Sequence, residues 1–385
     1  MLDVATAAGE IVEPLKSTCD GSESTRQLSP EAAALMHQAG LTKIVTPASH
    51  GGYQMTVRDL VEAERIIAHG SSAASWVLMV TGAHTFIAGR LPSAGLDEIF
   101  GADPGVLIPG VPSTRPGRAV RVEGGYRLTG RWPYASGADV GQWYIVGATG
   151  TVDETGTRCP TILAFLPADD ISLDDTWFTT GMRGTGSKDI VLDDVFVPDH
   201  LTVRASAAVL GTVEGVDVGL YRLPVQATLA TMLLGSIVGM AEAFRDIVIE
   251  QAKTRRHAYT GTPKVESAGM QRRVAEASGE IAAAWALTQQ SCDMLDAAMN
   301  TQPPMPIGLR SQVRWNAAFA NELCLRATNR LLGASGAGAA HKTNPLERLY
   351  RDISTATRHA MLDFDTAVEM HGQHLLGLEL EDGLV

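Results

Sequence analysis

The sequence is poor in cysteine and carries no excess of positive charge. Four of its 385 residues are cysteines, and none of them forms a Cys-x-x-Cys pair. This argues against a zinc site or a disulfide framework and fits a reducing cytosol. The formal net charge is -12, which argues against a nucleic-acid partner because phosphate neutralisation needs clustered Lys and Arg. We therefore expect a cytoplasmic protein with no metal site.

A signal peptide and a membrane span are also not expected. Residues 1–15 include Asp3 and Glu10, and they have neither a basic start nor a long apolar run. The uncharged stretch 223–241 is nearly long enough to span a bilayer. It also contains Gln226, Thr, Ser and several small residues, which suit a lipid-facing helix poorly. We predict a helix buried on all sides within a bundle, and no membrane partner.

The pattern along the chain predicts three regions. Hydrophobic residues make up 45% of the chain and charged residues 19%, as expected for a globular protein with more than one packed core. Residues 1–104 read as helices, residues 105–217 as an antiparallel β domain, and residues 218–385 as a helix bundle. The predicted fold class is α+β, mainly α.

Local signals position several of these elements. Ser29 is a candidate N-cap with Pro30 at the first helical position, and Thr56 is a second candidate N-cap. Two alternating runs around Gly124-Gly125 predict a β-hairpin. Four long helices are expected in the last region, over residues 223–256, 264–299, 307–332 and 345–375.

A glycine-dense loop precedes one of the predicted strands. Residues 181–187 read GMRGTGS, and a strand-like run, 189–197, follows. The glycine spacing does not match a dinucleotide fingerprint, and no helix follows. A phosphate loop is excluded as well, because Ser187 and Lys188 stand in the reverse order. On spacing alone, a tight turn that enters a strand remains an equal alternative to a ligand-binding loop.

Four segments stand out together: SSAASWVLMVTGAH (71–84), GRWPYASGAD (130–139), WFTTGMRGTGSKDIVLDDVFVP (177–198) and NPLERLYRDISTATRHAMLDFD (344–365). As a set they resemble the acyl-CoA dehydrogenase fold superfamily over nearly the whole chain. The similarity is closer to its flavin-dependent monooxygenase branch, the oxygenase components of two-component hydroxylases. That branch includes p-hydroxyphenylacetate hydroxylase, dibenzothiophene monooxygenase and actinorhodin-type polyketide hydroxylases. The resemblance implies a helical domain, a middle antiparallel β-barrel or sandwich and a C-terminal four-helix bundle.

The resemblance implies three catalytic residues. His84 matches a histidine that faces the substrate, and Ser136 matches a serine that hydrogen-bonds flavin N5 and protects the oxygen adduct. His359 matches a C-terminal histidine beside flavin C4a that assists oxygen activation. Histidine suits such roles because its pKa lies near working pH. A satisfied core or surface histidine is the alternative in each case.

The resemblance also implies a set of cofactor contacts. Trp132 and Tyr134 would shape the site of the flavin ring, although packing in the β core is an equal alternative for each. The glycine loop would place backbone amides and hydroxyl groups against the flavin. The residues implied from this loop are Arg183, Gly184, Thr185 and Ser187.

The phosphate end of the flavin requires a cation. Arg255 or Arg256 stands where related proteins place an arginine that reaches across a subunit interface, and Arg255 is favoured. Gly333, Ala334 and Ser335 resemble a second contact from the neighbouring subunit, with a flexible connector as the alternative. We interpret Arg348, Arg351 and Asp352 as structural residues that pair within the bundle or a tetramer.

By resemblance, the function is that of a monooxygenase that uses reduced FMN or FAD from a separate NAD(P)H:flavin reductase. With O2 it would form a flavin C4a-hydroperoxide and hydroxylate a small aromatic or polycyclic substrate, and the family implies a homotetramer. N-oxygenation of an amine is one alternative. An acyl-CoA dehydrogenase is another, although the C-terminal segment lacks the Tyr-Glu-Gly context of its carboxylate base. A helical oligomer without flavin is the third.

Overall fold

The computed structural model describes residues 2–152 and 158–380. The chain begins with helices, and two of them start directly after the N-cap residues predicted from the sequence. The Ser29 side chain accepts from the Ala32 amide, and Thr56 forms a capping box with Asp59, which confirms both predicted N-caps. These helices are α1 Val4–Thr25, α2 Pro30–Gln38, α3 Val57–Ile67, α4 Ser72–Ala88 and α5 Ser93–Phe100.

The strands of the middle region form a single twisted sheet. Within the described residues its order is β6-β7-β3-β2-β4-β5-β8, and β1 pairs with β4. The predicted hairpin at Gly124-Gly125 is confirmed by the β2–β3 pair. The strands are β1 Gly110–Val111, β2 Gly117–Val122, β3 Gly125–Ala135, β4 Trp143–Gly150, β5 Ile162–Pro167, β6 Ser172–Asp174, β7 Lys188–Pro198 and β8 Thr202–Arg204.

The sheet is not wholly antiparallel. β4 pairs in parallel with both β1 and β2, whereas the other strand pairs are antiparallel. Strand β3 runs back antiparallel to β2. The chain then passes to the other side of β2 and reverses again, so β4 runs in the same direction as β2. Alternation of polar and apolar residues reports burial of one face and does not report strand direction.

Long helices follow the sheet. They are α6 Ala205–Leu210, α7 Val225–Thr254, α8 Ala268–Ala298, α9 Ile307–Ser335, α10 Pro345–Ala356 and α11 Phe364–Leu375. The prediction of one helix over 345–375 was wrong. The chain leaves the helix after Ala356, and the side chains of His359 and Asp363 then accept from the amides of Met361 and Thr366. These two N-caps start new turns within a sequence that keeps a helical period.

Helix α7 accounts for the uncharged stretch. By length and composition it could cross a membrane, but 94% of its most apolar window is buried inside the molecule, as predicted for a bundle core. Its small residues allow close packing on α3. A β-carbon at Gly239 would lie 2.3 Å from the Arg65 carbonyl oxygen, and one at Gly235 would lie 2.5 Å from that of Val61.

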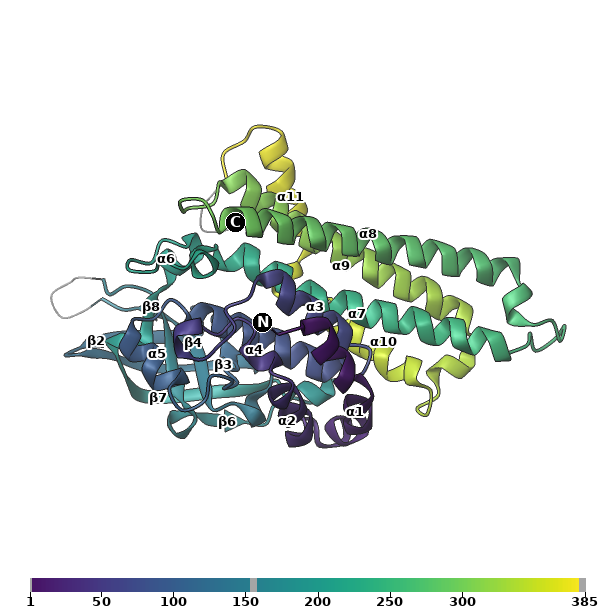
Figure 1. Ribbon diagram of the computed structural model, residues 1–385, viewed down its shortest axis with the longest axis horizontal. Helices are drawn as coiled ribbons and strands as arrows, with labels where there is room; N and C mark the ends of the chain where they lie inside the picture. The colour runs from purple at the N-terminus through teal and green to yellow at the C-terminus, as the bar shows by residue number, and fades with distance from the viewer. Residues whose placement is uncertain (1, 153–157, 381–385) are drawn as a thin grey trace.

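The arrangement of layers is visible in Figure 1. The strands gather at one end of the molecule, and α7, α8 and α9 extend side by side away from them. Helices α3 and α4 lie between the sheet and the long helices, and α10 packs along α7. Helix α4 is buried along nearly its whole length. It therefore brings its own side chains close to both the sheet and the bundle.

Candidate active site

Ser136 is positioned by a break in strand β3. The pairing of β3 with β7 shifts its register between Trp132 and Ala135. Pro133, which lacks an amide hydrogen, and Tyr134, which has a φ of 75°, occupy the bulge. Such backbone strain is kept where the surrounding structure fixes it. The bulge turns the end of the strand so that the buried Ser136 meets α4 and the glycine loop.

A chain of hydrogen bonds runs from α4 through Ser136 into the glycine loop. The Trp76 indole N–H donates to Ser136 Oγ at 3.2 Å. Ser136 Oγ lies 2.7 Å from Ser187 Oγ, which lies 2.6 Å from Thr185 Oγ1. Thr185 donates its own hydrogen to the Met182 carbonyl at 2.8 Å. Because that hydrogen is used, Ser187 must donate to Thr185, and Ser136 must donate to Ser187. Ser136 Oγ is left with acceptor capacity and no hydrogen to give.

His84 on α4 is a buried, neutral imidazole. Its Nδ1 lies 2.7 Å from the Ile108 carbonyl oxygen, so Nδ1 carries the hydrogen and Nε2 is the acceptor. Burial lowers the pKa of His84 to about 4, and the nearby His359 adds to that effect. The ring therefore stays neutral at physiological pH, with an unprotonated acceptor nitrogen at Nε2.

His359 has the opposite tautomer. Its Nδ1 accepts from the Met361 amide at 3.2 Å, so the hydrogen of the neutral ring is on Nε2. Its ring meets that of Trp76 edge-on with 5.8 Å between centroids. The residue remains exposed to solvent on one side, but the surrounding protein lowers the pKa of the imidazole to about 4, and the charge of Arg314 contributes. His84 and His359 thus offer one acceptor and one donor from neighbouring positions.

These residues make up the histidine cluster: Trp76, His84, Ser136 and His359. The structure brings all three sequence-predicted catalytic residues into it, from α4, from the end of β3 and from the break between α10 and α11. Trp76 is the residue that sequence reasoning missed. The sequence does contain one indication of Trp76. It stands eight residues before His84, and this spacing places both residues on one side of α4.

The two aromatic residues of the bulged strand lie differently. Trp132 is completely buried, and its indole N–H donates to the Gly147 carbonyl at 2.7 Å. This geometry is that of core packing, the alternative that the sequence left open. Tyr134 is 69% exposed and meets Trp177 edge-on at 6.2 Å. Tyr134 is therefore the one of the pair that a ligand could reach.

The glycine loop packs against protein. A β-carbon added at any of its three glycines would approach a neighbouring element too closely, and for Gly181 the Arg351 carbonyl oxygen would lie at 2.0 Å. A β-carbon at Gly184 would contact Ala73 on α4 and Ser22 on α1, each at 3.0 Å. The glycines thus let helices dock on the loop, which fixes the Thr185 and Ser187 hydroxyl groups. The contacts predicted between the loop and a flavin remain predictions.

Charged residues hold the same loop in place. The buried Asp352 carboxylate on α10 accepts from the Met182 amide at 2.6 Å and from the Ser72 hydroxyl. Arg183 pairs with Glu23 at 3.3 Å and donates to the Thr179 carbonyl. Its guanidinium is thus directed to protein partners. Arg348 and Arg351 pair with acidic residues of α1 and of their own helix, in keeping with a structural role.

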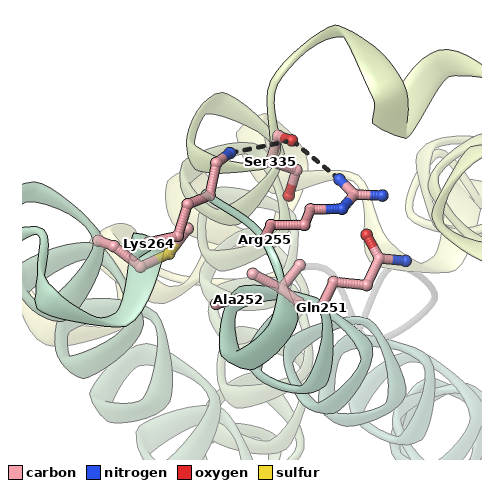
Figure 2. Close-up of a pocket in the computed structure, with 7 residues that line it drawn as sticks. Gln251, Ala252, Arg255, Lys264 and Ser335 are labelled. Carbon is pink, nitrogen blue, oxygen red and sulfur yellow. Dashed lines mark hydrogen bonds between the residues drawn. The ribbon is translucent and has the colours of Figure 1, made fainter. Parts of the chain in front are cut away.

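A second cluster lies where α7 and α9 end. Arg255 Nη1 lies 3.4 Å from the Ser335 carbonyl oxygen, and Lys264 Nζ lies 3.5 Å from the same oxygen and 3.3 Å from that of Ala334. Figure 2 shows both cations converging on Ser335 above a small pocket. Arg255, Lys264 and Ser335 form the cation cluster. Arg256 is turned to the Gly261 carbonyl, which favours Arg255 of the two candidates.

The last turn of α9 is open near this cluster. Nothing lies within 4 Å of a β-carbon built on Gly333, whereas the Ser335 hydroxyl donates to the Leu331 carbonyl of its own helix. Lys264 was not found from the sequence. Lys264 and Ser335 are 71 residues apart in the sequence. No short sequence motif therefore indicates that the two residues meet.

The histidine and cation clusters are far apart in one chain. Ser75, next to Trp76, bonds Ser236 in the middle of α7, with 2.7 Å between the hydroxyl oxygens. Arg255 caps the C-terminal end of the same helix. At 1.5 Å per residue, the stretch of helix from Ser236 to Arg255 is about 29 Å long. The ring and the phosphate of one flavin lie much closer together than this, so one chain cannot hold a single cofactor with both clusters.

Comparisons with known proteins agree with this architecture. Residues 232–364 match the family model for the C-terminal domain of acyl-CoA dehydrogenases. The structure of XiaF from Streptomyces sp., in complex with FADH2 and glycerol, superposes with a TM-score of 0.90 at 31% identity, over 98% of this chain and 96% of that one.

Curated relatives are similar over their full length. The oxygenase subunit HsaA of a flavin-dependent monooxygenase from Rhodococcus jostii is 29% identical over 97% of this chain and 98% of its own. The oxygenase component of an FADH(2)-dependent resorcinol hydroxylase from Rhizobium sp. is 28% identical over 98% and 94%.

The fold is therefore that of the acyl-CoA dehydrogenases. Within that fold, the chain belongs to the flavin-dependent monooxygenases, as an oxygenase component.

Proposed function

We propose that the protein uses reduced FMN or FAD, supplied by a separate NAD(P)H:flavin reductase, to transfer one oxygen atom of O2 to an aromatic substrate. The observation that carries this proposal is the histidine cluster. It presents the His84 Nε2 acceptor, the His359 Nε2–H donor and the Ser136 acceptor, all uncharged at neutral pH. Relatives named for resorcinol and p-hydroxyphenylacetate support a phenolic substrate class.

The residues present fit a reduced flavin. Ser136 gives its hydrogen to Ser187, so its remaining lone pair can accept the N5–H of a reduced ring. A bound reduced flavin supplies the electrons that activate oxygen. A held N5–H would hinder loss of peroxide. Burial of His84, Ser136 and the loop hydroxyl groups keeps water from competing for these contacts.

The two histidines divide the hydrogen-bonding roles. His84 Nε2 can accept a hydrogen bond from a substrate hydroxyl, because its Nδ1 hydrogen is held by the Ile108 carbonyl. His359 Nε2–H can donate to an oxygen atom on which negative charge develops. Neither residue needs to change its charge state between pH 6 and 8, because both pKa values lie at about 4.

The cation cluster would hold the phosphate end of the flavin from another copy of the chain. Arg255 and Lys264 share carbonyl partners and have no carboxylate partner among the described residues. The length of α7 prevents them from meeting the flavin of their own chain. An oligomer, which the family implies to be a homotetramer, follows from this proposal. The four cysteines of the chain are all unpaired, which supports a cytoplasmic location.

The geometry does not favour dehydrogenation of an acyl-CoA. That reaction needs a carboxylate base at the flavin. Within the described residues, the hydrogen bonds of His84, Ser136 and His359 run to a backbone carbonyl, the Trp76 indole, the Ser187 hydroxyl and a backbone amide, and none of them runs to a carboxylate.

Rapid mixing tests the proposal. Protein with chemically reduced FMN, and separately FAD, is mixed with oxygenated buffer, and the appearance of oxidised flavin and of hydrogen peroxide is followed. We expect bound flavin to be reoxidised far more slowly than free flavin, with peroxide released late. Reoxidation at the rate of free flavin would contradict the proposal. Bleaching of bound oxidised FAD by an acyl-CoA would instead identify a dehydrogenase.

A further inference from the structure

Arg314 on α9 is a buried cation with little to neutralise it. It is 5% exposed, and its Nε has no hydrogen-bond partner among the described residues. Its Nη1 donates one long hydrogen bond of 3.5 Å to the side-chain oxygen of Gln226. A neutral amide does not balance a guanidinium charge.

The acidic residue that acts on Arg314 does not pair with it. Asp363 exerts an attractive field on the guanidinium. Its carboxylate is exposed, however, and it is already used to cap α11 by accepting from the Thr366 amide at 2.9 Å. The other ionisable neighbour identified within the described chain is His359, whose pKa Arg314 lowers. Among residues 2–152 and 158–380, Arg314 therefore has no anion at contact distance.

Such a residue is costly for the fold. An arginine keeps its charge in a protein, and a buried charge without a partner destabilises the folded state. Arg314 also lies where the proposed reaction takes place, beside His359 and the first turn of α7. A ligand that brings an anionic oxygen would remove the imbalance.

We propose that Arg314 binds an anionic oxygen of the aromatic substrate, a phenolate or a carboxylate, next to His359. This inference rests on the proposed function. Trp76 donates to Ser136, the residue assigned to the flavin ring, and meets His359, on which Arg314 acts. Arg314 is thus linked to the ring site through two other side chains, and we assign the anion to the substrate rather than to the flavin. A guanidinium matches such an oxygen with directed, charge-assisted hydrogen bonds.

The test uses 4-nitrophenol above its pKa, as the anionic probe, and 4-nitroanisole as its neutral analogue. Binding of both to the purified full-length protein is measured by calorimetry for the wild type, Arg314→Met, Arg314→Lys and the control Arg326→Met. Arg326 lies on the same helix but is exposed and paired with Glu280. Thermal unfolding and the affinity for reduced FMN are measured on the same variants.

We expect Arg314→Met to weaken 4-nitrophenolate binding by roughly tenfold to a hundredfold, the range of charge-assisted hydrogen bonds. Arg314→Lys should lose less, and 4-nitroanisole and reduced FMN should bind as before. Bound 4-nitrophenol should also ionise at a lower pH in the wild type than in Arg314→Met. The ligand-free Arg314→Met protein should unfold at a higher temperature, because the uncompensated charge is gone.

Several results would overturn the inference. They are equal loss of the anionic and neutral probes, no loss of either, no binding of 4-nitrophenolate by the wild type, or a loss confined to reduced FMN. The last result would assign the anion to the flavin. If Arg314→Met does not fold, the Arg314→Lys titration decides. Slow reoxidation of bound flavin in wild type and variants alike would show that the proposed function stands even where this inference fails.

Discussion

The histidine cluster and the cation cluster differ in how complete they are within one chain. In the first, each hydroxyl hydrogen from Ser136 to Thr185 has a defined acceptor, and both histidines have a fixed tautomer. In the second, Arg255 and Lys264 meet two backbone carbonyls and no anion among the described residues. The first is preorganised by its own fold, whereas the second needs a ligand that its own chain cannot place there.

The largest expected effect is at His359. The surrounding protein, with a contribution from the charge of Arg314, lowers the pKa of its ring and keeps it neutral, so its Nε2–H is available as a donor. Replacing it with alanine should lower the yield of oxygenated product per reduced flavin roughly a hundredfold, the lower range for loss of an acid–base group. His341→Ala, at an exposed histidine bonded to Thr343, is the control. A product yield that stays at the wild-type level in His359→Ala would remove the histidine from the chemistry.

The cation cluster should control flavin affinity without altering the chemistry. Arg255→Met and Lys264→Met should each weaken binding of reduced FMN by about tenfold, the scale of one charge-assisted contact. The effect should diminish at high salt because exposed charges are screened. The control is Lys253→Met, at an exposed lysine that stands two residues before Arg255 and pairs with Glu250. Anaerobic titration measures the affinities, and an equal loss in the control would contradict a specific phosphate contact.

Ser136 should decide how much oxygen is lost as peroxide. Ser136→Ala removes the acceptor assigned to flavin N5–H, and we expect peroxide release per flavin to rise about tenfold, the scale of one hydrogen bond in a buried site. Thr185→Val breaks the same hydrogen-bond chain two links further away and should have a smaller effect. Peroxide assays on both variants test the order. A larger effect from Thr185→Val would contradict the direct role of Ser136.

The smallest effect concerns pH. Because the pKa of His359 is lowered to about 4, the product yield should show no inflection near pH 6.5.

The pKa of His84 also gives the free energy of unfolding a pH dependence with a defined sign. The buried His84 takes up its proton at about pH 6.5 when unfolded and at about 4 when folded, so its contribution is complete above 6.5 and declines on acidification to about 4. The slope is at most about 1.4 kcal/mol per pH unit. Unfolding titrations of wild type and His84→Gln should diverge in this range, and parallel curves would contradict it.

The fold could be predicted from the sequence because its signals are local and repeated. The N-caps Ser29 and Thr56, the Gly124-Gly125 turn and the apolar α7 stretch each determine a short segment. The break after Ala356 could not be predicted in the same way. His359 and Asp363 act there as caps only because the chain turns, and the same letters fit a continuous helical period.

The candidate site could be predicted to the extent that its segments resemble a known family. His84, Ser136 and His359 were named from those segments, and the structure brings them into one cluster, while their catalytic roles remain predictions. Trp76, Lys264 and Arg314 were not found, because their importance lies in partners distant in sequence. Trp132 is the opposite case, a residue that the sequence suggested for the flavin site but that packs in the core. It is conspicuous in the sequence beside Tyr134, yet it is a core residue bonded to Gly147.

A crystal structure of the protein with FMN bound would test the central claim most directly. The account predicts that the flavin ring contacts Ser136 and His359 of one protomer and that its phosphate contacts Arg255 and Lys264 of another. A flavin whose ring and phosphate are both held by a single protomer, with Arg255 and Lys264 facing solvent, would contradict it.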